Sequence, residues 1–556
     1  MTNTRSTASL FQTFSLPNQD LSKLSFCASE PAKLEQWLES LPSTRTTETS
    51  VIFYKALPEI CRLTISPEKR IRLLETVYPH VHQCIEGAMH KLLRQPLLLS
   101  SQMMKLAVIT QALQRHLNEG YMVALKDLTQ TSKNTGDQSL SALCLYRVIS
   151  GLGLLLLRSY QFYTPQPPTG IWLKLHAFYQ FAIEQQLEKM AIKDSLLKSQ
   201  QAMAISTSYK RSLLLACSSP LQLRQVDMIH VFQAFEQCAS MVHLKPAKED
   251  DRQSLYWVSL KHDKSPFYNH HLRGEPGKGI YAINLESLIA TLKSTGESNN
   301  NRQSSLHLPI PYSNVVVTHL LRCWGKTNSR LMERQSSTEP LEICVGLTAL
   351  HNQLLGDDRF ESLTHNSRQK GLEEGNLLSN PNDDWQLEEK LEAPISQANT
   401  SETLLTVNTL NSSVSGYCLI WENEVPDKVR VGELLGLRQP KQLGWHIGII
   451  CWAQRHKDKV YTGVRLLSQK ATAYAASTVL SDGSKSPYFR ALLLTSGSRD
   501  ESHSVITPSI PFAVDQTVVL RRFEEKISAY LTDLLITSAT VSQFSYRLVN
   551  ESQKSI

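Results

Sequence analysis

Apolar residues recur at helical spacing over most of the segment from Ile52 to Val242. Ser66-Pro67-Glu68 has the features of a helix start, with a hydroxyl for the N-cap, a proline at the first helical position and an acid in the first turn. Gly120 suits the C-terminal end of a later helix. The apolar stripe of that later helix lies at Met103, Leu106, Ile109, Leu113 and Leu117. Further helices are predicted over residues 140–163, 171–190, 195–217 and 225–242.

This run of helices predicts an all-α domain over residues 51–243, after a flexible N-terminal segment over residues 1–50. Successive helices with short connections stack as helical hairpins, as in tetratricopeptide arrays, although no fixed repeat of that length is present. Such a stack would offer a surface for a protein partner. A helical bundle with a purely structural role is the alternative.

Residues 250–310 change character and predict a small α/β linker domain. Residues 255–260 resemble a strand and residues 284–292 a short helix. The segment between them holds His262, His270 and His271, which could ligate a metal ion. Because no acid or cysteine stands at ligand spacing, we expect these histidines to face solvent and expect no metal site.

A helix over residues 315–324 opens the C-terminal half, which then becomes β-rich. Several short segments rich in β-branched and aromatic residues predict a small antiparallel barrel within residues 311–480. Its candidate strands span residues 341–347, 416–421, 431–437, 446–452 and 460–467. The acid-rich, polar residues 356–401 predict a disordered insertion.

The last part of the chain, residues 485–556, predicts a further β-rich extension. Residues 491–495 and 516–520 favour strands, and residues 525–535 favour either a helix or a long strand. The fold class is therefore multi-domain α+β, with a helical-hairpin N-terminal half, a C-terminal antiparallel β-barrel and an extra β segment.

Composition limits the class of protein. A chain of 556 residues is too long for one core, and about three or four domains are expected. The net charge of +7 is spread too thinly to indicate a nucleic acid polymer as partner. The ten cysteines are scattered and read as reduced, mostly buried thiols. The polar N-terminus and the absence of a long apolar run predict a cytoplasmic protein with no membrane insertion.

The sequence lacks the common signatures of enzymes. Gly325-Lys326-Thr327 imitates the end of a phosphate-binding loop, but Leu320 stands where that loop needs glycine. Gly151 and Gly153 lie in a helical run, where small residues usually serve close packing. Neither G-x-S-x-G nor H-E-x-x-H occurs. We therefore expect no enzymatic activity and no cofactor.

Two short motifs in order along the chain could form a ligand site. Arg330 and Arg334 form R-x-x-x-R just before the first predicted barrel strand, and Asn411, Ser413 and Gly416 form N-x-S-x-x-G just before the next. Arginine binds phosphate oxygens or a guanine edge with two parallel hydrogen bonds. An asparagine can donate and accept at a base edge, and a glycine permits positive φ or a close backbone approach. Read alone, the second motif is a polar turn that enters a strand.

With these motifs, the segment from about residue 328 to residue 467 resembles a PilZ domain, the bacterial cyclic di-GMP receptor barrel. The similarity extends to VRVGELLGLR, WHIGIICW and TGVRLLS, which match the later strands of that barrel. The resemblance implies that Arg330 and Arg334 wrap the ligand's guanines and phosphates as a flexible lead-in closes over the barrel. It implies Asn411, Ser413 and Gly416 as the remaining ligand-binding residues.

The whole chain is also similar to large cytoplasmic proteobacterial proteins linked to type IV pili, biofilm formation and surface attachment. The resemblance predicts a cyclic di-GMP effector that changes conformation on binding and regulates attachment, pili or motility. Two features depart from the family: the long separation between the motifs, and Asn411 where aspartate is more common. Lengthening a flexible loop costs only about 0.6 kcal/mol per doubling, so the fold tolerates the insertion.

Two other functions are compatible with the sequence. One is a protein-interaction scaffold whose degenerate PilZ barrel does not bind nucleotide. The other is a binder of single-stranded nucleic acid, which needs basic residues interleaved with aromatics across the strands. The charges between Trp421 and Trp452 are mixed, which disfavours it.

Overall fold

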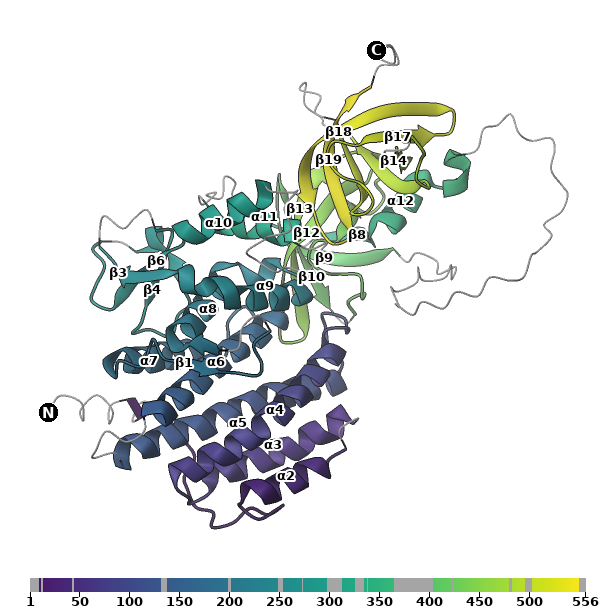
Figure 1. Ribbon diagram of the computed structural model, residues 1–556. Helices are drawn as coiled ribbons and strands as arrows, with labels where there is room; N and C mark the ends of the chain where they lie inside the picture. The colour runs from purple at the N-terminus through teal and green to yellow at the C-terminus, as the bar shows by residue number, and fades with distance from the viewer. Residues whose placement is uncertain are drawn as a thin grey trace. The chain divides into compact units, whose positions relative to one another are not determined.

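The structure is a computed structural model that divides into two compact units (Figure 1). The helical unit comprises residues 1–333, 421–431 and 452–462, and the barrel unit comprises residues 334–420, 432–451 and 463–556. The described residues are 10–11, 14–42, 45–131, 138–198, 202–248, 254–272, 274–297, 313–325, 335–337, 339–364, 404–422, 424–479, 483–495 and 503–549.

Helices that follow one another in the chain pack together in the N-terminal half of the helical unit (Figure 1). This confirms the predicted all-α architecture. The helices are α2 (Pro31–Glu39), α3 (Thr46–Arg62), α4 (Pro67–Leu92), α5 (Ser101–Thr131), α6 (Gln138–Gln161), α7 (Ile171–Glu184), α8 (Ile205–Cys217) and α9 (Gln225–Cys238).

Local sequence signals place some of these helices well and others poorly. The side chain of Ser66 caps α4 by accepting a hydrogen bond from the Lys69 backbone nitrogen at 3.3 Å. Gly120, by contrast, does not end a helix: α5 continues to Thr131. A Cβ at Gly120 would lie 2.8 Å from Leu74 Cδ2, so this glycine allows α5 to approach α4 closely. Gly153 has the predicted packing role on α6, against Ser212 on α8.

One predicted helix is shorter than expected. The helix predicted over residues 195–217 begins only at Ile205, and a two-stranded hairpin precedes it. The strands of that hairpin are β1 (Ala191–Lys193) and β2 (Ala202–Ala204).

The predicted α/β segment forms a four-stranded sheet in the order β3-β6-β4-β5. His270 and His271 are exposed, as predicted, and no cluster of histidine, cysteine or acidic residues that could hold a metal ion occurs within the described ranges. The elements are β3 (His243–Pro246), β4 (Tyr256–Ser259), β5 (Phe267–Tyr268), β6 (Ile280–Asn284), α10 (Glu286–Glu297) and α11 (Ser313–Trp324).

Helix α6 is long and apolar enough to cross a membrane by length and composition alone. However, 72% of its most apolar window is buried inside the protein, which is the property of the core helix of a folded domain.

A closed antiparallel barrel, the middle barrel, confirms the barrel prediction. Its strand order is β10-β13-β12-β11-β8-β9, and β9 pairs with β10 to close the ring, while β7 adds to β9. The strands are β7 (Gln335–Ser336), β8 (Pro340–Val345), β9 (Leu405–Ser413), β10 (Gly416–Glu422), β11 (Leu434–Arg438), β12 (His446–His456) and β13 (Lys459–Ser468). Strand β9 is absent from the sequence prediction.

The extra β segment forms a second closed barrel, the C-terminal barrel, in the order β14-β15-β16-β19-β18-β17 (Figure 1). The segment predicted as a helix or a long strand is strand β18. The strands are β14 (Ala471–Thr478), β15 (Phe489–Leu494), β16 (Ser504–Pro508), β17 (Thr517–Arg522), β18 (Glu525–Thr537) and β19 (Val541–Leu548).

Helix α12 (Leu347–Leu355) packs against both barrels of the barrel unit, through β8 and β11 of one and β14 and β15 of the other. His351 on this helix is fully buried, and its Nε2 lies 3.0 Å from the backbone oxygen of Tyr474. The predicted insertion starts beyond this helix. Residues 356–364 still belong to the fold, because Leu363 is buried in the core between the barrels. The rest of the insertion lies outside the described residues.

All ten cysteines are free, and seven are buried. Both observations agree with the prediction of reduced, mostly buried thiols.

Candidate functional site

The N-x-S-x-x-G motif forms a tight β-hairpin at one end of the middle barrel. Asn411 and Ser413 lie in the last three residues of β9, Val414 and Ser415 make the turn, and Gly416 begins β10. In the register of this hairpin Ser413 lies opposite Gly416, and Asn411 lies opposite Cys418. The prediction of a turn directly ahead of a strand is wrong in this detail, because the motif's polar residues are themselves in a strand.

Strand β9 was not predicted from the sequence because the residues on one face of this strand are polar. Val407 and Thr409 are buried, and they alternate with the exposed Thr406 and Asn408. The register of the hairpin shifts after Thr409, which lies opposite Leu419, whereas Asn411 lies opposite Cys418. Because Cys418 and Leu419 are consecutive and point to opposite faces, Asn411 and Ser413 project to the face opposite to that of Val407 and Thr409. Both motif residues are half-buried on that second face.

Gly416 is required by a close backbone approach and not by a left-handed conformation. Its φ lies outside the positive range. A Cβ at this position would collide with the backbone oxygen of Val464 on β13 and lie 3.3 Å from Arg465 Cα. The sequence left open whether this glycine serves a positive φ or a close approach. The structure selects the close approach, and the neighbour is strand β13.

The two polar side chains of the hairpin have different environments. The hydroxyl of Ser413 lies 3.2 Å from the Ser415 hydroxyl and donates to the Gly416 carbonyl at 3.3 Å. The amide of Asn411 has no hydrogen-bond partner among the described residues. Asn411 is therefore free to contact a ligand, whereas Ser413 also holds the turn together.

Arg330 and Arg334 lie outside the described residues, but the residue that follows Arg334 is placed. Gln335 pairs with Ser412, and Ser336 pairs with Asn411, in the short ladder between β7 and β9. The β7–β9 pairing thus places the two residues that directly follow the R-x-x-x-R motif beside the end of the hairpin strand.

Thr409 fastens this lead-in to the barrel, and sequence reasoning missed it. Its side chain is buried, and its hydroxyl lies 2.8 Å from the Glu339 carbonyl and 3.2 Å from the Ser337 carbonyl. These two residues lie between β7 and β8, where the strand pairing with β9 is interrupted. The buried position of Thr409 in an alternating strand was the available signal, and it becomes readable only with the register.

A pocket of about 250 Å³ opens at the same end of the middle barrel, which we call the hairpin end. Tyr417, which follows the motif glycine, lines it and is half-buried, and burial raises the pKa of its hydroxyl. The other lining residues come from the ends of β8 and β11, the start of β12 and the β11–β12 loop: Leu341, Leu437, Arg438, Gln439, Gln442 and His446.

Arg438 is the charged side chain of this pocket with the most defined geometry. Its Nε donates to a carboxylate oxygen of Glu342 at 2.6 Å, and its guanidinium carbon lies 4.4 Å from the centre of the Trp445 ring. The stacked, ion-paired arginine is thereby fixed in orientation. Sequence reasoning did not select Arg438, although an arginine close to a tryptophan at a strand end was a visible signal.

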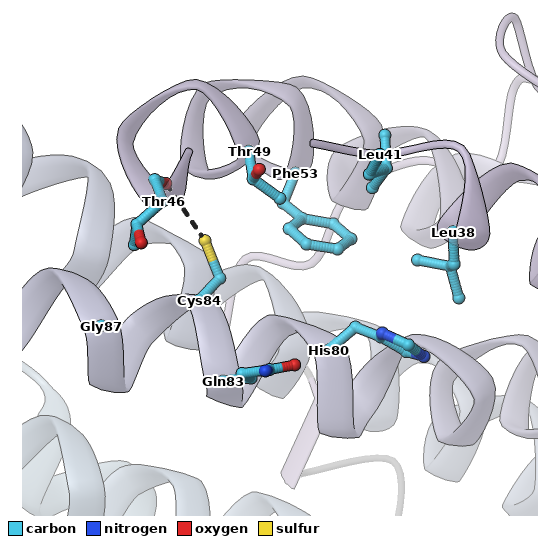
Figure 2. A pocket seen from close by; sticks show the side chains of 9 residues that line it. All are labelled: Leu38, Leu41, Thr46, Thr49, Phe53, His80, Gln83, Cys84 and Gly87. Carbon is cyan, nitrogen blue, oxygen red and sulfur yellow. Dashed lines mark hydrogen bonds between the residues drawn. The ribbon is translucent and has the colours of Figure 1, made fainter. Parts of the chain in front are cut away.

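The helical unit has a surface pocket of about 230 Å³ between α3 and α4 (Figure 2). Phe53 and Thr49 reach it from α3, and His80, Gln83 and Cys84 reach it from α4. Its buried polar groups already have partners: Thr49 donates to the Pro42 carbonyl at 2.9 Å, and the Cys84 thiol donates to the Thr46 carbonyl at 3.4 Å. The buried polar groups of this pocket therefore do not need a ligand as a hydrogen-bond partner.

Comparison with known proteins adds an independent line of evidence. The chain matches three family models: the N-terminal domain of the cyclic-di-GMP receptor FimW over residues 32–249, its middle PilZ domain over residues 255–402 and 379–473, and its C-terminal β-barrel domain over residues 474–549. The cyclic-di-GMP receptor FimW of Pseudomonas aeruginosa is 27% identical over 569 residues, which cover 96% of this chain and 93% of that protein. No solved structure matches the chain.

Proposed function

Because the chain belongs to the FimW family of cyclic-di-GMP receptors, which carry a middle PilZ domain, we propose that it binds cyclic di-GMP at the hairpin end of the middle barrel. The family assignment confirms the PilZ resemblance inferred from the motifs. The observation that supports the site is the β7–β9 pairing, because it places the residues directly after the R-x-x-x-R motif against the strand of the N-x-S-x-x-G hairpin.

The chemistry of the hairpin end suits the proposed ligand. Arg330 and Arg334 bind phosphate oxygens and guanine edges through paired, charge-assisted hydrogen bonds. Asn411 offers a free amide to a base edge, and Ser413 adds a hydroxyl. Gly416 lets the hairpin lie against β13, which fixes the wall on which the ligand rests.

The pocket next to the hairpin supplies the remaining contacts in this proposal. Tyr417 presents an aromatic ring from the residue next to the motif, and Arg438 presents a guanidinium held by Glu342. A guanine base can stack on either group. The site therefore combines an arginine lead-in, a polar hairpin and a stacking surface.

Binding is coupled to the helical unit through the strands of the middle barrel. Residues 452–456 at the C-terminal end of β12 and residues 421–431 before β11 belong to the helical unit. Within that unit the Arg455 backbone nitrogen donates to the Tyr163 carbonyl at 2.8 Å. Arg224 Nε donates to the Val431 carbonyl at 2.9 Å in the same unit. A ligand that binds one arrangement of these strands better than another shifts the population toward it. The output in this proposal is regulation of surface attachment, pili or motility from the cytoplasm, through a protein partner on the helices and without catalysis.

Isothermal titration of the full chain with cyclic di-GMP tests the proposal. Binding at micromolar concentration is expected, and the double variant Arg330→Ala, Arg334→Ala is expected to lose about a hundredfold or more, because each arginine contributes charge-assisted hydrogen bonds. Arg359→Ala is the matched control, since Arg359 is exposed in the barrel unit and belongs to neither motif. Absence of heat in the wild type, or equal affinity in the double variant, would favour the scaffold function in which the barrel does not bind nucleotide.

A further inference from the structure

A second pocket of the helical unit differs from the one in Figure 2 in that, within the described ranges, it is lined by a buried arginine without a carboxylate partner and by a buried histidine with an unsatisfied nitrogen. It has a volume of about 130 Å³ and lies between α4, α6, α8 and α9. Its polar wall includes Arg158 from α6, His82 from α4, and Asp194, Arg211 and Glu236. Its apolar wall includes Leu154, Leu157 and Phe232. All these residues lie within the helical unit.

Arg158 is a buried guanidinium without a carboxylate partner among the described residues. It is 5% exposed, and its Nη1 donates to the amide oxygen of Gln114 at 3.1 Å. Burial lowers its pKa to about 10, so the side chain remains charged at neutral pH. Glu86 is the carboxylate whose charge acts on Arg158, and it does so from an exposed position at the pocket.

The neighbouring buried arginines show that the helical unit normally neutralises such charges. Arg147 forms ion pairs of 2.8 Å with both Glu75 and Asp194, and Arg211 pairs with Glu236 at 2.9 Å. A buried ion costs several kcal/mol unless it is paired and hydrogen-bonded. Arg158 is thus the exception. It lines a pocket and forms no ion pair with a carboxylate among the described residues, so its charge can bind an anionic ligand.

His82 provides, on the same wall, a buried polar atom without a hydrogen-bond partner in the described part of the chain. It is 3% exposed, and its Nε2 has no hydrogen-bond partner. Burial, together with the positive charges of Arg158 and Arg147, lowers its pKa well below the usual range, so the ring is neutral. A buried polar atom without a partner is rare in folded proteins and needs a reason. A ligand that accepts from Arg158 and bonds to His82 provides one.

We propose that this pocket binds a small organic carboxylate, with the carboxylate on Arg158 and His82 and an apolar body against Leu154, Leu157 and Phe232. A cavity needs about 10–15 Å³ to hold one group the size of a water molecule. A volume of about 130 Å³ therefore fits a ligand of about ten heavy atoms.

A monoanion is favoured over a phosphate for two reasons. Asp194 and Arg211 of the same lining are already in ion pairs with Arg147 and Glu236, respectively, so among the described lining residues only the buried positive charge of Arg158 is left for a ligand. The exposed Glu86 at the pocket also repels a second negative charge.

Titration of the full chain with benzoate and hexanoate, with benzamide as the neutral analogue, tests this site. Both acids are expected to bind in the millimolar range or tighter, and benzamide about tenfold or more weaker, because it lacks the charge that pairs with Arg158. Arg158→Met is expected to weaken binding of both acids by about tenfold or more. Replacing a buried charge by an apolar side chain of similar size is often neutral or stabilising, so this variant should fold.

Two further variants make the test decisive. Lys198→Met removes an exposed charge at the same pocket and should leave affinity within about twofold, whereas Leu154→Trp fills the pocket and should abolish binding. Acids that do not bind, or that bind Arg158→Met as well as the wild type, would overturn the proposal. Cyclic di-GMP affinity in Arg158→Met should be unchanged, which separates this site from the one at the middle barrel.

Discussion

The two barrels of this protein share a six-stranded closed ring but use their interiors differently. In the C-terminal barrel, apolar side chains such as Tyr474, Phe512 and Phe544 fill the core. In the middle barrel, β9 ends in the half-buried polar residues Asn411 and Ser413, and the same end of the barrel holds a pocket of about 250 Å³. In our proposal the same architecture serves stability in one case and a binding site in the other, and the difference lies in a few residues at one strand end.

The largest expected effect separates stability from binding. Phe544→Ala removes a ring that is 1% exposed from the core of the C-terminal barrel and should cost about 3–5 kcal/mol of unfolding free energy. Cyclic di-GMP affinity should remain within about twofold, as measured by chemical denaturation and titration of the same preparation. A large loss of affinity in folded protein would contradict the division of labour between the barrels.

Gly416→Ala should damage the middle barrel in both properties. The added methyl meets the Val464 backbone oxygen, and such overpacking costs about 1–3 kcal/mol. Because the hairpin must then move away from β13, affinity for cyclic di-GMP should fall about tenfold or more. Gly444→Ala is the matched control in the same barrel, since a Cβ there has no heavy atom within 4 Å. Equal behaviour of the two variants would show that the close approach is unimportant.

The helix between the barrels should make the protein sensitive to acid. Burial lowers the pKa of His351 to about 4, whereas the unfolded chain titrates near 6.5. Between these values the unfolded state binds the proton and the folded state does not, so stability falls as pH drops from 6.5 toward 4 and is unaffected above this window. His351→Gln, whose amide can still donate to the Tyr474 carbonyl, should reduce the loss between pH 7 and pH 5 by up to about 2 kcal/mol. Denaturation curves at both pH values measure it, and an unchanged pH dependence would refute the assignment.

Thr409→Val should give the smallest effect and the most specific one. The isosteric change removes the hydroxyl that bonds the Ser337 and Glu339 carbonyls, at a cost of about 1 kcal/mol in stability. Because the lead-in is then less firmly attached to β9, cyclic di-GMP affinity should fall about threefold to tenfold. Thr406→Val, on the exposed face of the same strand, should leave affinity unchanged. Titration of both variants measures the difference.

The sequence predicted those parts of the fold whose signals are local. Ser66 correctly predicts the start of α4 through its N-cap. The apolar run after Gly416 predicts β10, with its C-terminal end placed within one residue of the observed one. Strand β9 was missed because polar residues lie on its exposed face. Gly120 was wrongly predicted to end a helix, whereas it lies inside α5 and allows close packing against α4. Local pattern cannot reveal which neighbour a strand or helix will meet.

The candidate site follows the same rule. Asn411, Ser413 and Gly416 were selected from their spacing, and the structure brings them together in one hairpin. Thr409 and Arg438 could not be ranked from the sequence, because their roles depend on pairing with residues 337–339 and on the proximity of Trp445. The positions of Arg330 and Arg334 remain a prediction that the strand pairing of Gln335 supports.

Hydrogen–deuterium exchange of the full chain, with and without cyclic di-GMP, tests the central claim most directly. Ligand should slow exchange in peptides that cover residues 330–340 and 405–418, while peptides that cover residues 504–548 of the C-terminal barrel stay unchanged. Protection that appears only outside the middle barrel, or no protection at saturating ligand, would contradict the assignment of the hairpin end as the receptor site.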